Sequence, residues 1–325
     1  MMIHGPPLPN PVSCQSRSTC PGTIYSKDMP IRIEAGTGQH IGDRAEQQDR
    51  LIIIPSKREP GVLLAVVADG MGGHTGGAMA AQQVISTTQQ LFENFSTRDD
   101  APQKLLTSIV NEAHMIITLS SFTSEQEPHS TVVAMLLQKE RADWAHVGDS
   151  RLYHFRGQPL VKRTRDHSYV EQLFTEGKIT EGQMETHPNK NLLVHCLGST
   201  NAPRIDFGGT DKLLPDDTFM LCSDGVWAYF SDLELGSILA ACPPRTASEQ
   251  LISLARERSN GRGDNCSLAI VKLTYFEDAK PKPPPPPASP KPLPAAPPKV
   301  AAAPAEAVAE KPEKQGMFGK LFGKK

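Results

Sequence analysis

The sequence of 325 residues lacks the marks of a membrane or secreted protein. No apolar run is long enough to cross a bilayer, and the N-terminal segment 1–22 has no apolar stretch of the secretory type. The six cysteines form no Cys-x-x-Cys pair and no disulfide-like framework, which is typical of a reducing compartment. We therefore expect a cytoplasmic protein that is not an integral membrane protein.

A strong excess of charge of one sign is also missing. The formal net charge is −2, so no global field favours a nucleic acid as partner. The charge is unevenly spread, however, because residues 278–325 hold nine Lys against three Glu and one Asp. The tail is therefore basic, and the remaining residues are acidic.

Motifs of several enzyme classes are absent. No Gly-Lys-Ser/Thr completes a Walker loop, and no Arg follows a Cys at the spacing of cysteine phosphatases. An Asp-Phe-Gly triplet occurs at 206–208, but neither a VAIK-type strand nor an HRD-type loop precedes it. We therefore exclude a kinase and predict that this triplet is a turn at the edge of a strand.

Composition divides the chain into three regions. Residues 1–28 are rich in Pro, Ser and Gly without periodicity and are predicted to be disordered. Residues 29–277 carry the periodic segments of a folded domain. Residues 278–325 begin as a Pro-rich linker and end in the basic amphipathic tip GMFGKLFGKK. This tip is either a docking peptide for a partner or a solvated tail.

The periodic segments predict an α+β domain. Short polar turns join the middle strands, which favours antiparallel hairpins over a doubly wound parallel sheet. Strands are expected at 50–55, 61–68, 130–138, 142–148, 151–157, 218–223 and 266–275, and helices at 78–95, 102–122, 168–176 and 245–259.

Four aspartates stand where strand-like segments meet tight polar turns: Asp69, Asp149, Asp224 and Asp264. Each one alone is readily explained as a turn or helix-capping residue. Gathered together they would repel one another unless a cation neutralised them. Without a His or Cys ligand pattern, the expected cation is Mg²⁺ or Mn²⁺, which suits phosphoryl chemistry. Arg44, just before a strand, is then a candidate for binding phosphate.

The sequence resembles the metal-dependent (type 2C, PPM) Ser/Thr protein phosphatases, specifically their bacterial branch. The similarity covers about residues 30–275 and rests on several motifs that follow in the family's order. These motifs are RAEQQD (44–49), VVADGMGGH (66–74), HSTVVAMLL (129–137), AHVGDSRLYHFRG (145–157), RTRDHSYVEQLFTEGKIT (163–180), HPNKNLLVHCLGS (187–199), LCSDGVW (221–227) and GRGDNCSLAIV (261–271).

This resemblance implies a central sandwich of two antiparallel sheets flanked by helices, with two Mn²⁺ or Mg²⁺ ions in a cleft at one end. Asp69 would bridge both ions, the carbonyl of Gly70 would bind one of them, and Asp224 and Asp264 would complete the second ion's carboxylates. Asp149 would belong to a third, weaker metal site.

The resemblance also implies a reaction, in which a water or hydroxide between the two ions attacks phosphoserine or phosphothreonine. Arg44 would bind the substrate phosphate, and Asp49 would accept hydrogen bonds from the water. Residues 166–200 would form a flap over the cleft. The implied partners are phosphorylated proteins, with a bacterial Ser/Thr kinase that acts on the same proteins, and we expect a monomer.

Several positions depart from the family's pattern. Gln48 replaces a glutamate, Met71 stands where many eukaryotic members have a histidine, and Ala228 replaces an acid of the third metal site. Lys190 and His195 occupy places where the flap usually has arginines. These departures keep open the alternative of an inactive phosphatase-like module that binds phosphoproteins.

Overall fold

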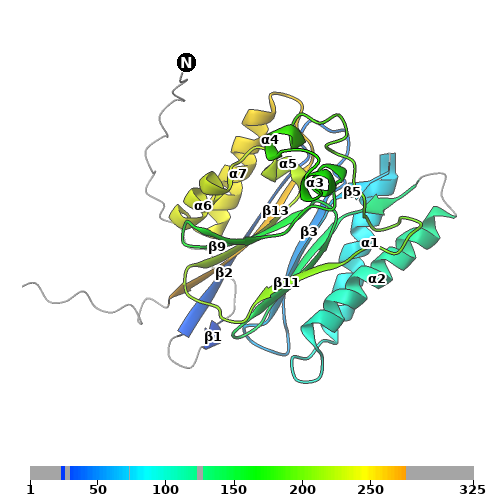
Figure 1. Cartoon of the computed structure of the whole chain (residues 1–325). Coiled ribbons are helices and arrows are strands. Elements are labelled where there is room, and N and C mark those ends of the chain that lie inside the picture. The colour runs from blue at the N-terminus through cyan, green and yellow to red at the C-terminus, as the bar shows by residue number, and fades with distance from the viewer. Residues whose placement is uncertain (1–22, 26–29, 73, 123–126, 276–325) are drawn as a thin grey trace, which may run out of the picture. The chain divides into compact units, whose positions relative to one another are not determined.

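The computed structural model describes residues 23–25, 30–72, 74–122 and 127–275 of the chain. Two antiparallel sheets face each other, and helices cover the outer face of each sheet (Figure 1). The first sheet has the order β1 (Thr23–Tyr25), β2 (Pro30–His40), β13 (Cys266–Tyr275), β12 (Asp217–Cys222), β9 (Arg151–Arg156) and β10 (Leu160–Arg163). The second has the order β11 (Asp206–Thr210), β8 (Ala142–Val147), β7 (Val132–Leu137), β4 (Leu63–Ala68) and β3 (Arg50–Pro55). A short ribbon pairs β5 (Gly70–Met71) with β6 (His129–Ser130).

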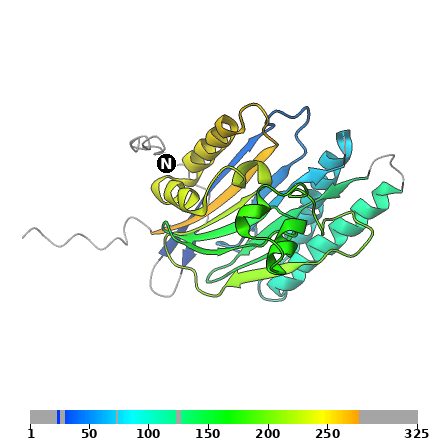
Figure 2. The same ribbon diagram turned by 45° about the horizontal axis from the view of Figure 1, so that its top comes forward.

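The helices divide between the two sheets. Two long helices, α1 (His74–Glu93) and α2 (Pro102–Ser121), pack on the five-stranded sheet. On the six-stranded sheet lie α5 (Asp224–Trp227), α6 (Asp232–Ala241) and α7 (Pro244–Ser259). Figure 2 shows the two helical layers on opposite sides of the sandwich. Two short helices, α3 (Tyr169–Thr175) and α4 (Glu181–Met184), lie in the connection between β10 and β11.

Strand β4 shows why its sequence is a continuous apolar run. Successive side chains of a strand point to opposite faces. Leu64 and Val66 belong to the cluster under α1 and α2, whereas Leu63, Ala65 and Val67 belong to the cluster between the sheets. Both faces of the strand are therefore buried, and no polar alternation is possible at these positions.

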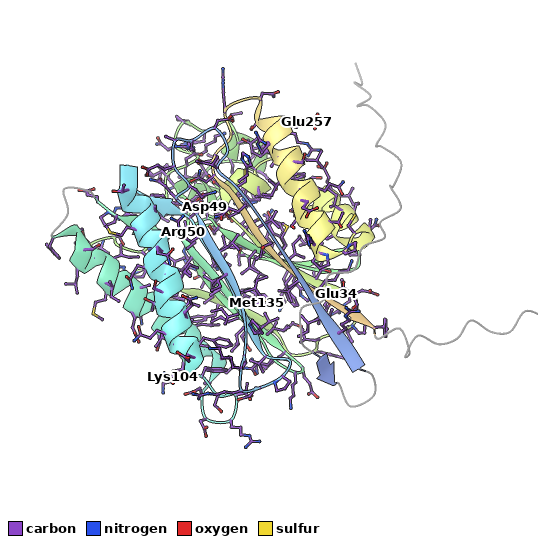
Figure 3. The ribbon with its side chains drawn as sticks, turned by 180° about the vertical axis from the view of Figure 1, so that it is seen from behind. Glu34, Asp49, Arg50, Lys104, Met135 and Glu257 are labelled. Carbon is purple, nitrogen blue, oxygen red and sulfur yellow. The ribbon has the colours of Figure 1, made fainter. Side chains whose placement is uncertain are left out.

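Strand β12 repeats this arrangement in the other sheet. Phe219 and Leu221 enter the cluster between the sheets, which also contains Met135 at the centre of the domain (Figure 3). Met220 and Cys222 enter the cluster under α6 and α7. Cys222 is fully buried, as expected for a small apolar residue. Apolar packing on both sides of each sheet fixes the strand ends that follow.

The predicted fold class is confirmed, and most predicted elements occur at the expected positions. Helix α1 begins at His74, earlier than the expected start at 78. Helix α6 was not expected; its first turn is capped by the Ser231 hydroxyl, which accepts a hydrogen bond from the Glu234 amide. Ser231 and Glu234 have the spacing of a capping box, which marks the start of a helix.

The prediction that residues 206–208 form a turn is wrong. They belong to the edge strand β11, in which Phe207 pairs with Ala145 of β8. A Cβ added to Gly208 would lie 2.3 Å from the Trp144 ring, so glycine allows the backbone to pass flat against the indole. Gly208 therefore serves close packing at a sheet edge.

Strand β1 falls inside the region 1–28 that the sequence predicts to be disordered, so that prediction is wrong for these residues. The rest of that prediction, and the predictions for 278–325, lie outside the described residues. Within the part of the chain that the structure describes, no helix is both long and apolar enough to span a bilayer.

Candidate functional site

A pocket of about 470 Å³ opens at the end of the sandwich where strands of both sheets stop. Six of the residues singled out in the sequence line it: Arg44, Asp69, Gly70, Asp149, Asp224 and Asp264. The remaining candidate, Asp49, does not line the pocket; its side chain is fully buried at the start of β3. The structure therefore brings together carboxylates that are up to 195 positions apart in the sequence.

Each sheet contributes part of this acidic group. Asp69 directly follows β4, and Asp149 follows β8, both in the five-stranded sheet. Asp224 opens α5 just beyond β12, and Asp264 precedes β13, both in the six-stranded sheet. The pocket is thus assembled at the seam between two sheets, and its geometry depends on how the sheets are held together.

The carboxylates affect one another strongly. Burial raises the pKa of Asp69 well above its usual range, and the charges of Asp49 and Asp224 raise it further. Burial also raises the pKa of Asp224 to about 6, with a further contribution from Asp264. The pKa of Asp149 is raised by burial and then by Asp224. Without a cation, burial and mutual repulsion favour the protonated form of these carboxyl groups. The ionised form therefore favours a bound positive charge.

The residues present fit a hard divalent cation. Within the described chain, Oδ1 of Asp224 and Oδ1 of Asp49 are buried and accept no hydrogen bond. Buried carboxylate oxygens without a donor are costly unless a cation or an ordered water meets them. The ligand set is oxygen only, which suits Mg²⁺ or Mn²⁺ rather than a metal that prefers sulfur or imidazole.

Gly70 is required by the packing of the pocket wall. A Cβ at Gly70 would lie 2.0 Å from the carbonyl oxygen of Gly77 in the first turn of α1. A Cβ at Gly77 would in turn lie 2.7 Å from the Gly70 carbonyl oxygen. The glycines after Asp69 therefore let β5 and α1 pack together at the rim of the site.

Arg44 lies at the mouth of the pocket and is paired with an acid. Its Nη2 donates to Oδ2 of Asp264 at 2.5 Å, and both side chains are exposed to solvent. An exposed ion pair contributes little net free energy. The guanidinium can therefore exchange this carboxylate for another anion at small cost.

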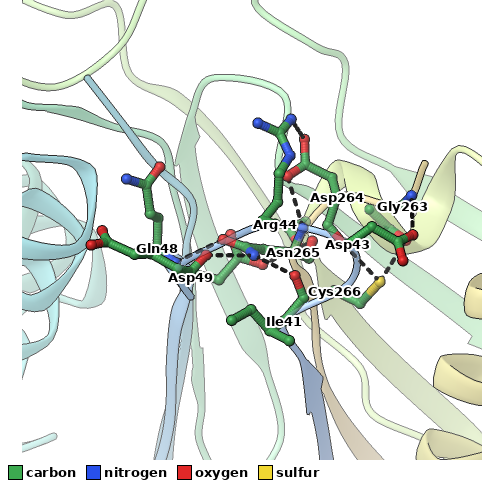
Figure 4. A network of polar contacts seen from close by, with 12 residues as sticks. Ile41, Asp43, Arg44, Gln48, Asp49, Gly263, Asp264, Asn265 and Cys266 are labelled. Atoms are coloured by element: carbon green, nitrogen blue, oxygen red, sulfur yellow. Dashed lines mark hydrogen bonds and ion pairs between the residues drawn. The ribbon is translucent and has the colours of Figure 1, made fainter. Parts of the chain in front are cut away.

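Asn265 fastens the segment that carries Arg44 to β13 (Figure 4). Its side-chain Oδ1 accepts from the amide of Gln48 at 2.7 Å, and its Nδ2 donates to the carbonyls of Ile41 and Glu46. Sequence reasoning missed this role, although Asn265 stands beside Asp264 in a quoted motif. The local motif contains Asn265, but the residues that its side chain contacts lie more than 200 positions away in the sequence.

Asp166 is a second residue that the sequence reasoning missed. Its negative charge raises the pKa of both Asp149 and Asp224, so it lies near the proposed third metal site. Its two oxygens are held by Arg151, at 2.8 Å and 2.7 Å. Ala228 ends the short helix α5 and brings no charge to this region.

The predicted flap segment extends over the pocket at residues Asn191 and Leu193. Its return arm is tied to its start by backbone hydrogen bonds, from Val194 to the carbonyl of His167 and from Tyr169 to the carbonyl of Leu192. Of the departures noted above, Gln48 and Met71 line the pocket, whereas Lys190, His195 and Ala228 are outside the described lining.

Where the flap begins, His146, His167 and Asp206 bring potential ligand atoms within 4.8 Å of one another. Nδ1 of His167 accepts a hydrogen bond from the Gly148 amide, so the proton of the neutral ring lies on Nε2, next to Asp206. A protonated nitrogen cannot ligate a metal. We therefore interpret His146 and His167 as a link between sheet and flap, through their hydrogen bonds with the Arg165 carbonyl and the Gly148 amide.

The chain matches the family model described as protein phosphatase 2C over residues 36–251. Among curated proteins, a putative protein phosphatase 2C-type of Streptococcus pyogenes is 29% identical over 246 residues, covering 75% of this chain and 97% of the relative. The serine/threonine phosphatase stp of Listeria monocytogenes is 30% identical over 218 residues, covering 64% and 84%.

Solved structures agree with these matches. A serine/threonine phosphatase of S. agalactiae superposes with a TM-score of 0.66 at 28% identity and covers 74% of this chain and 99% of its own. The catalytic domain of the serine threonine protein phosphatase PstP, in complex with two manganese ions, has a TM-score of 0.63 at 26% identity and covers 75% and 99%. With the sandwich, the acidic pocket and these matches taken together, the chain belongs to the protein phosphatase 2C family.

Proposed function

We propose that this chain is a metal-dependent protein phosphatase that hydrolyses phosphoserine and phosphothreonine in proteins. The observation that carries the proposal is the convergence of Asp69, Asp149, Asp224 and Asp264 on one pocket, with Arg44 at its mouth. Membership of the family and relatives that are named serine/threonine phosphatases support the same reaction.

The chain would hold two Mn²⁺ or Mg²⁺ ions through Asp69, Gly70, Asp224 and Asp264. A manganese-bound relative supports this choice of cation. Asp149 and Asp224 would hold a third, weaker ion. When bound, such ions lower the pKa of water to near neutrality and neutralise charge on phosphate oxygens.

Arg44 binds and orients the phosphate group in this proposal. Its planar guanidinium donates two parallel hydrogen bonds, a geometry that matches two phosphate oxygens. The exposed pair with Asp264 keeps the side chain at the pocket mouth and releases it readily. Arg44 thus contributes to binding the substrate and to stabilising charge in the transition state.

Asp49 takes the role of a hydrogen-bond acceptor behind the pocket. Its Oδ1 is free of hydrogen bonds from the described residues, while its Oδ2 is held by Ser223. The free oxygen can accept a hydrogen bond from a water bound to the ions and so orient that water. Met71 lines the pocket but has no proton to give, so the leaving oxygen must obtain its proton elsewhere.

The substrates we propose are phosphorylated proteins of a bacterial cell, opposed to a Ser/Thr kinase in the cytoplasm. The family match and the names of the bacterial relatives support this assignment. The alternative of an inactive phosphoprotein-binding module gains no support from the pocket, because every carboxylate implied to bind the two ions lines it.

The proposal is tested by incubating the purified full-length protein with phosphoserine and phosphothreonine peptides in the presence of Mn²⁺. We expect release of phosphate that a chelator abolishes and that added Mn²⁺ restores. A phosphate release that is unaffected by the chelator, or no release at any Mn²⁺ concentration, contradicts the proposed function.

A further inference from the structure

A buried hydrogen bond joins the two sheets beside the acidic pocket. Oδ2 of Asp49 accepts from the hydroxyl of Ser223 at 2.7 Å, and both side chains are fully buried. Asp49 directly precedes β3 of the five-stranded sheet, and β3 begins at Arg50 (Figure 3). Ser223 follows β12 of the six-stranded sheet. The contact therefore crosses the seam on which the pocket is built.

The Ser223 hydroxyl has only one proton to donate. The alternative acceptor, the carbonyl of Asn265, lies at 3.4 Å, so the carboxylate at 2.7 Å is the favoured partner. The hydroxyl oxygen of Ser223 also accepts a hydrogen bond from the Ser267 amide at 3.1 Å. The Ser223 amide in turn donates to the Ser267 carbonyl. Ser223 is thus held in one orientation by β13 and directs its proton at Asp49.

A second contact across the seam supports the first. The Nε2 of Gln39, on β2, donates to the backbone carbonyl of Asp49 at 3.1 Å and to the hydroxyl of Ser267 at 3.0 Å. Gln39 and Ser267 are direct partners in the pairing of β2 with β13. Both the backbone and the side chain of Asp49 are therefore held by groups of the opposite sheet.

We propose that Ser223 is a positioning residue: acting through Asp49, it fixes the separation of the carboxylates contributed by the two sheets and thereby sets the affinity of the centre for Mn²⁺. This inference rests on the proposed function. Ser223 directly precedes Asp224 in the chain. On the other sheet, Arg50 follows Asp49 and pairs with Ala68, and Ala68 directly precedes Asp69. The hydroxyl of Ser223 thus connects the strand end that carries Asp224 to the strand end that carries Asp69.

The size of the expected effect follows from comparable groups. Partners that orient the ligands of a metal typically change its affinity by about 10- to 100-fold when they are removed. In Ser223→Ala, Oδ2 of Asp49 loses its short charge-assisted hydrogen bond, and the buried carboxylate is free to turn. The ligand set itself stays complete, so the centre should bind Mn²⁺ more weakly without losing its sites.

The experiment measures Mn²⁺ binding to the metal-free full-length protein by calorimetry, without substrate. We expect Ser223→Ala to bind Mn²⁺ about 10- to 100-fold more weakly than the wild type. The matched control is Ser248→Ala, which removes a buried hydroxyl that bonds backbone carbonyls under α7, away from the pocket, and should bind Mn²⁺ like the wild type. Thermal melting of both variants checks folding.

Two further measurements separate positioning from damage. At saturating Mn²⁺, Ser223→Ala should keep the wild-type KM for a phosphopeptide, because Arg44 is unaffected. In an Asp49→Asn background, adding Ser223→Ala should change Mn²⁺ affinity less than threefold, since the two residues act as one unit. If Ser223→Ala does not fold, Ser267→Ala tests the same network, with an expected loss in affinity of about tenfold or less.

The possible failures are distinguishable. A wild-type protein that binds no Mn²⁺ overturns the proposed function itself. If the wild type binds Mn²⁺, two results overturn the positioning role alone. One is that Ser223→Ala binds Mn²⁺ as well as the wild type, and the other is that Ser223→Ala loses the same affinity in the Asp49→Asn background.

Discussion

The floor of the pocket and the flap above it are built differently. The floor stands at the ends of β4 and β12, whose residues are buried along their whole length. The flap contains two short helices, of which α3 has one buried residue and α4 has none. The floor acids are therefore fixed by the core of the domain, whereas the flap is held near His167 by a few backbone hydrogen bonds and by the pair of Asp166 with Arg151.

This difference assigns separate tasks to the two regions. Precise placement of charge requires rigid support, which the packed strand ends provide. A segment with few buried contacts opens at low free-energy cost and suits contact with varied substrates. We therefore expect substitutions in the floor to reduce catalysis strongly, and substitutions around the flap to alter stability or metal demand more mildly.

The largest effect is expected at the centre of the floor. Asp69→Asn should reduce turnover of a phosphopeptide at least ~10³-fold, because the asparagine removes the charge shared by both proposed ions. Asp99→Asn, on the exposed surface, is the matched control and should be unchanged. The measurement is kcat at saturating Mn²⁺. Near-normal turnover of the Asp69 variant would remove the basis for a two-metal floor.

At the mouth of the pocket the expected loss is smaller. Arg44→Ala should lower kcat/KM about 10²- to 10³-fold, as for the loss of one donor that stabilises charge. Arg44→Lys should recover only part of the activity, since an ammonium cannot bind two oxygens in parallel. Arg98→Ala, another exposed arginine, serves as control. Equal activity of the Ala and Lys variants would contradict bidentate phosphate binding.

The link between floor and flap should be sensitive to acid. Burial, and after it the neighbouring His146, lower the pKa of His167 to about 4, although Asp206 opposes the shift. In the unfolded chain the ordinary value is 6.5, so between these values the unfolded state binds the extra proton. Stability is therefore present above pH 6.5 and is lost as the pH falls towards 4.

Urea unfolding at pH 7 and pH 5 measures this loss. The contribution of His167 alone to the free energy of unfolding should fall by about 2 kcal/mol over this range. It is measured as the difference between the wild type and His167→Gln, because the raised pKa values of Asp69 and Asp224 act in the opposite sense. His167→Gln should show a smaller fall, and His187→Gln, half-buried in the flap and outside this cluster, should behave like the wild type. If the difference in stability between the wild type and His167→Gln is the same at pH 7 and pH 5, the cluster is not held neutral.

The smallest effect concerns the proposed third ion. Ala228→Asp should lower the Mn²⁺ concentration for half-maximal activity a few-fold, because hard cations gain affinity from an added carboxylate. Asp166 already lies near this place but is engaged by Arg151, which limits its contribution. Titrations of the wild type, Ala228→Asp and Asp149→Ala decide the matter. Superimposable curves for the first two would mean that Ala228 only fills space.

Much of the floor could be predicted because its signals are local. Apolar runs that end at Asp69 and Asp224 mark buried strands and their ends, and the antiparallel connections follow from short turns. That the acids would meet could be argued only from mutual repulsion and from family resemblance. Neither argument depends on the exact pairing of strands.

The hydrogen bonds that hold the floor could not be predicted in this way. The partners of Asn265 and the contact of Ser223 with Asp49 depend on strand register between distant parts of the chain. A shift of one residue would turn these side chains to the other face. The edge strand β11 was missed for a related reason, since Gly208 is explained by Trp144, which no local pattern reveals.

The mutual packing of Gly70 and Gly77 limits how this pocket can be engineered. Each glycine occupies the space that a side chain on the other would need, because the two backbones are in direct contact. Randomising either codon alone would return only glycine among active clones. Randomising both would not help, since a second side chain adds a second clash. Libraries that aim at new substrates should therefore leave this pair constant and vary positions 191 and 193, where the pocket wall comes from the flap.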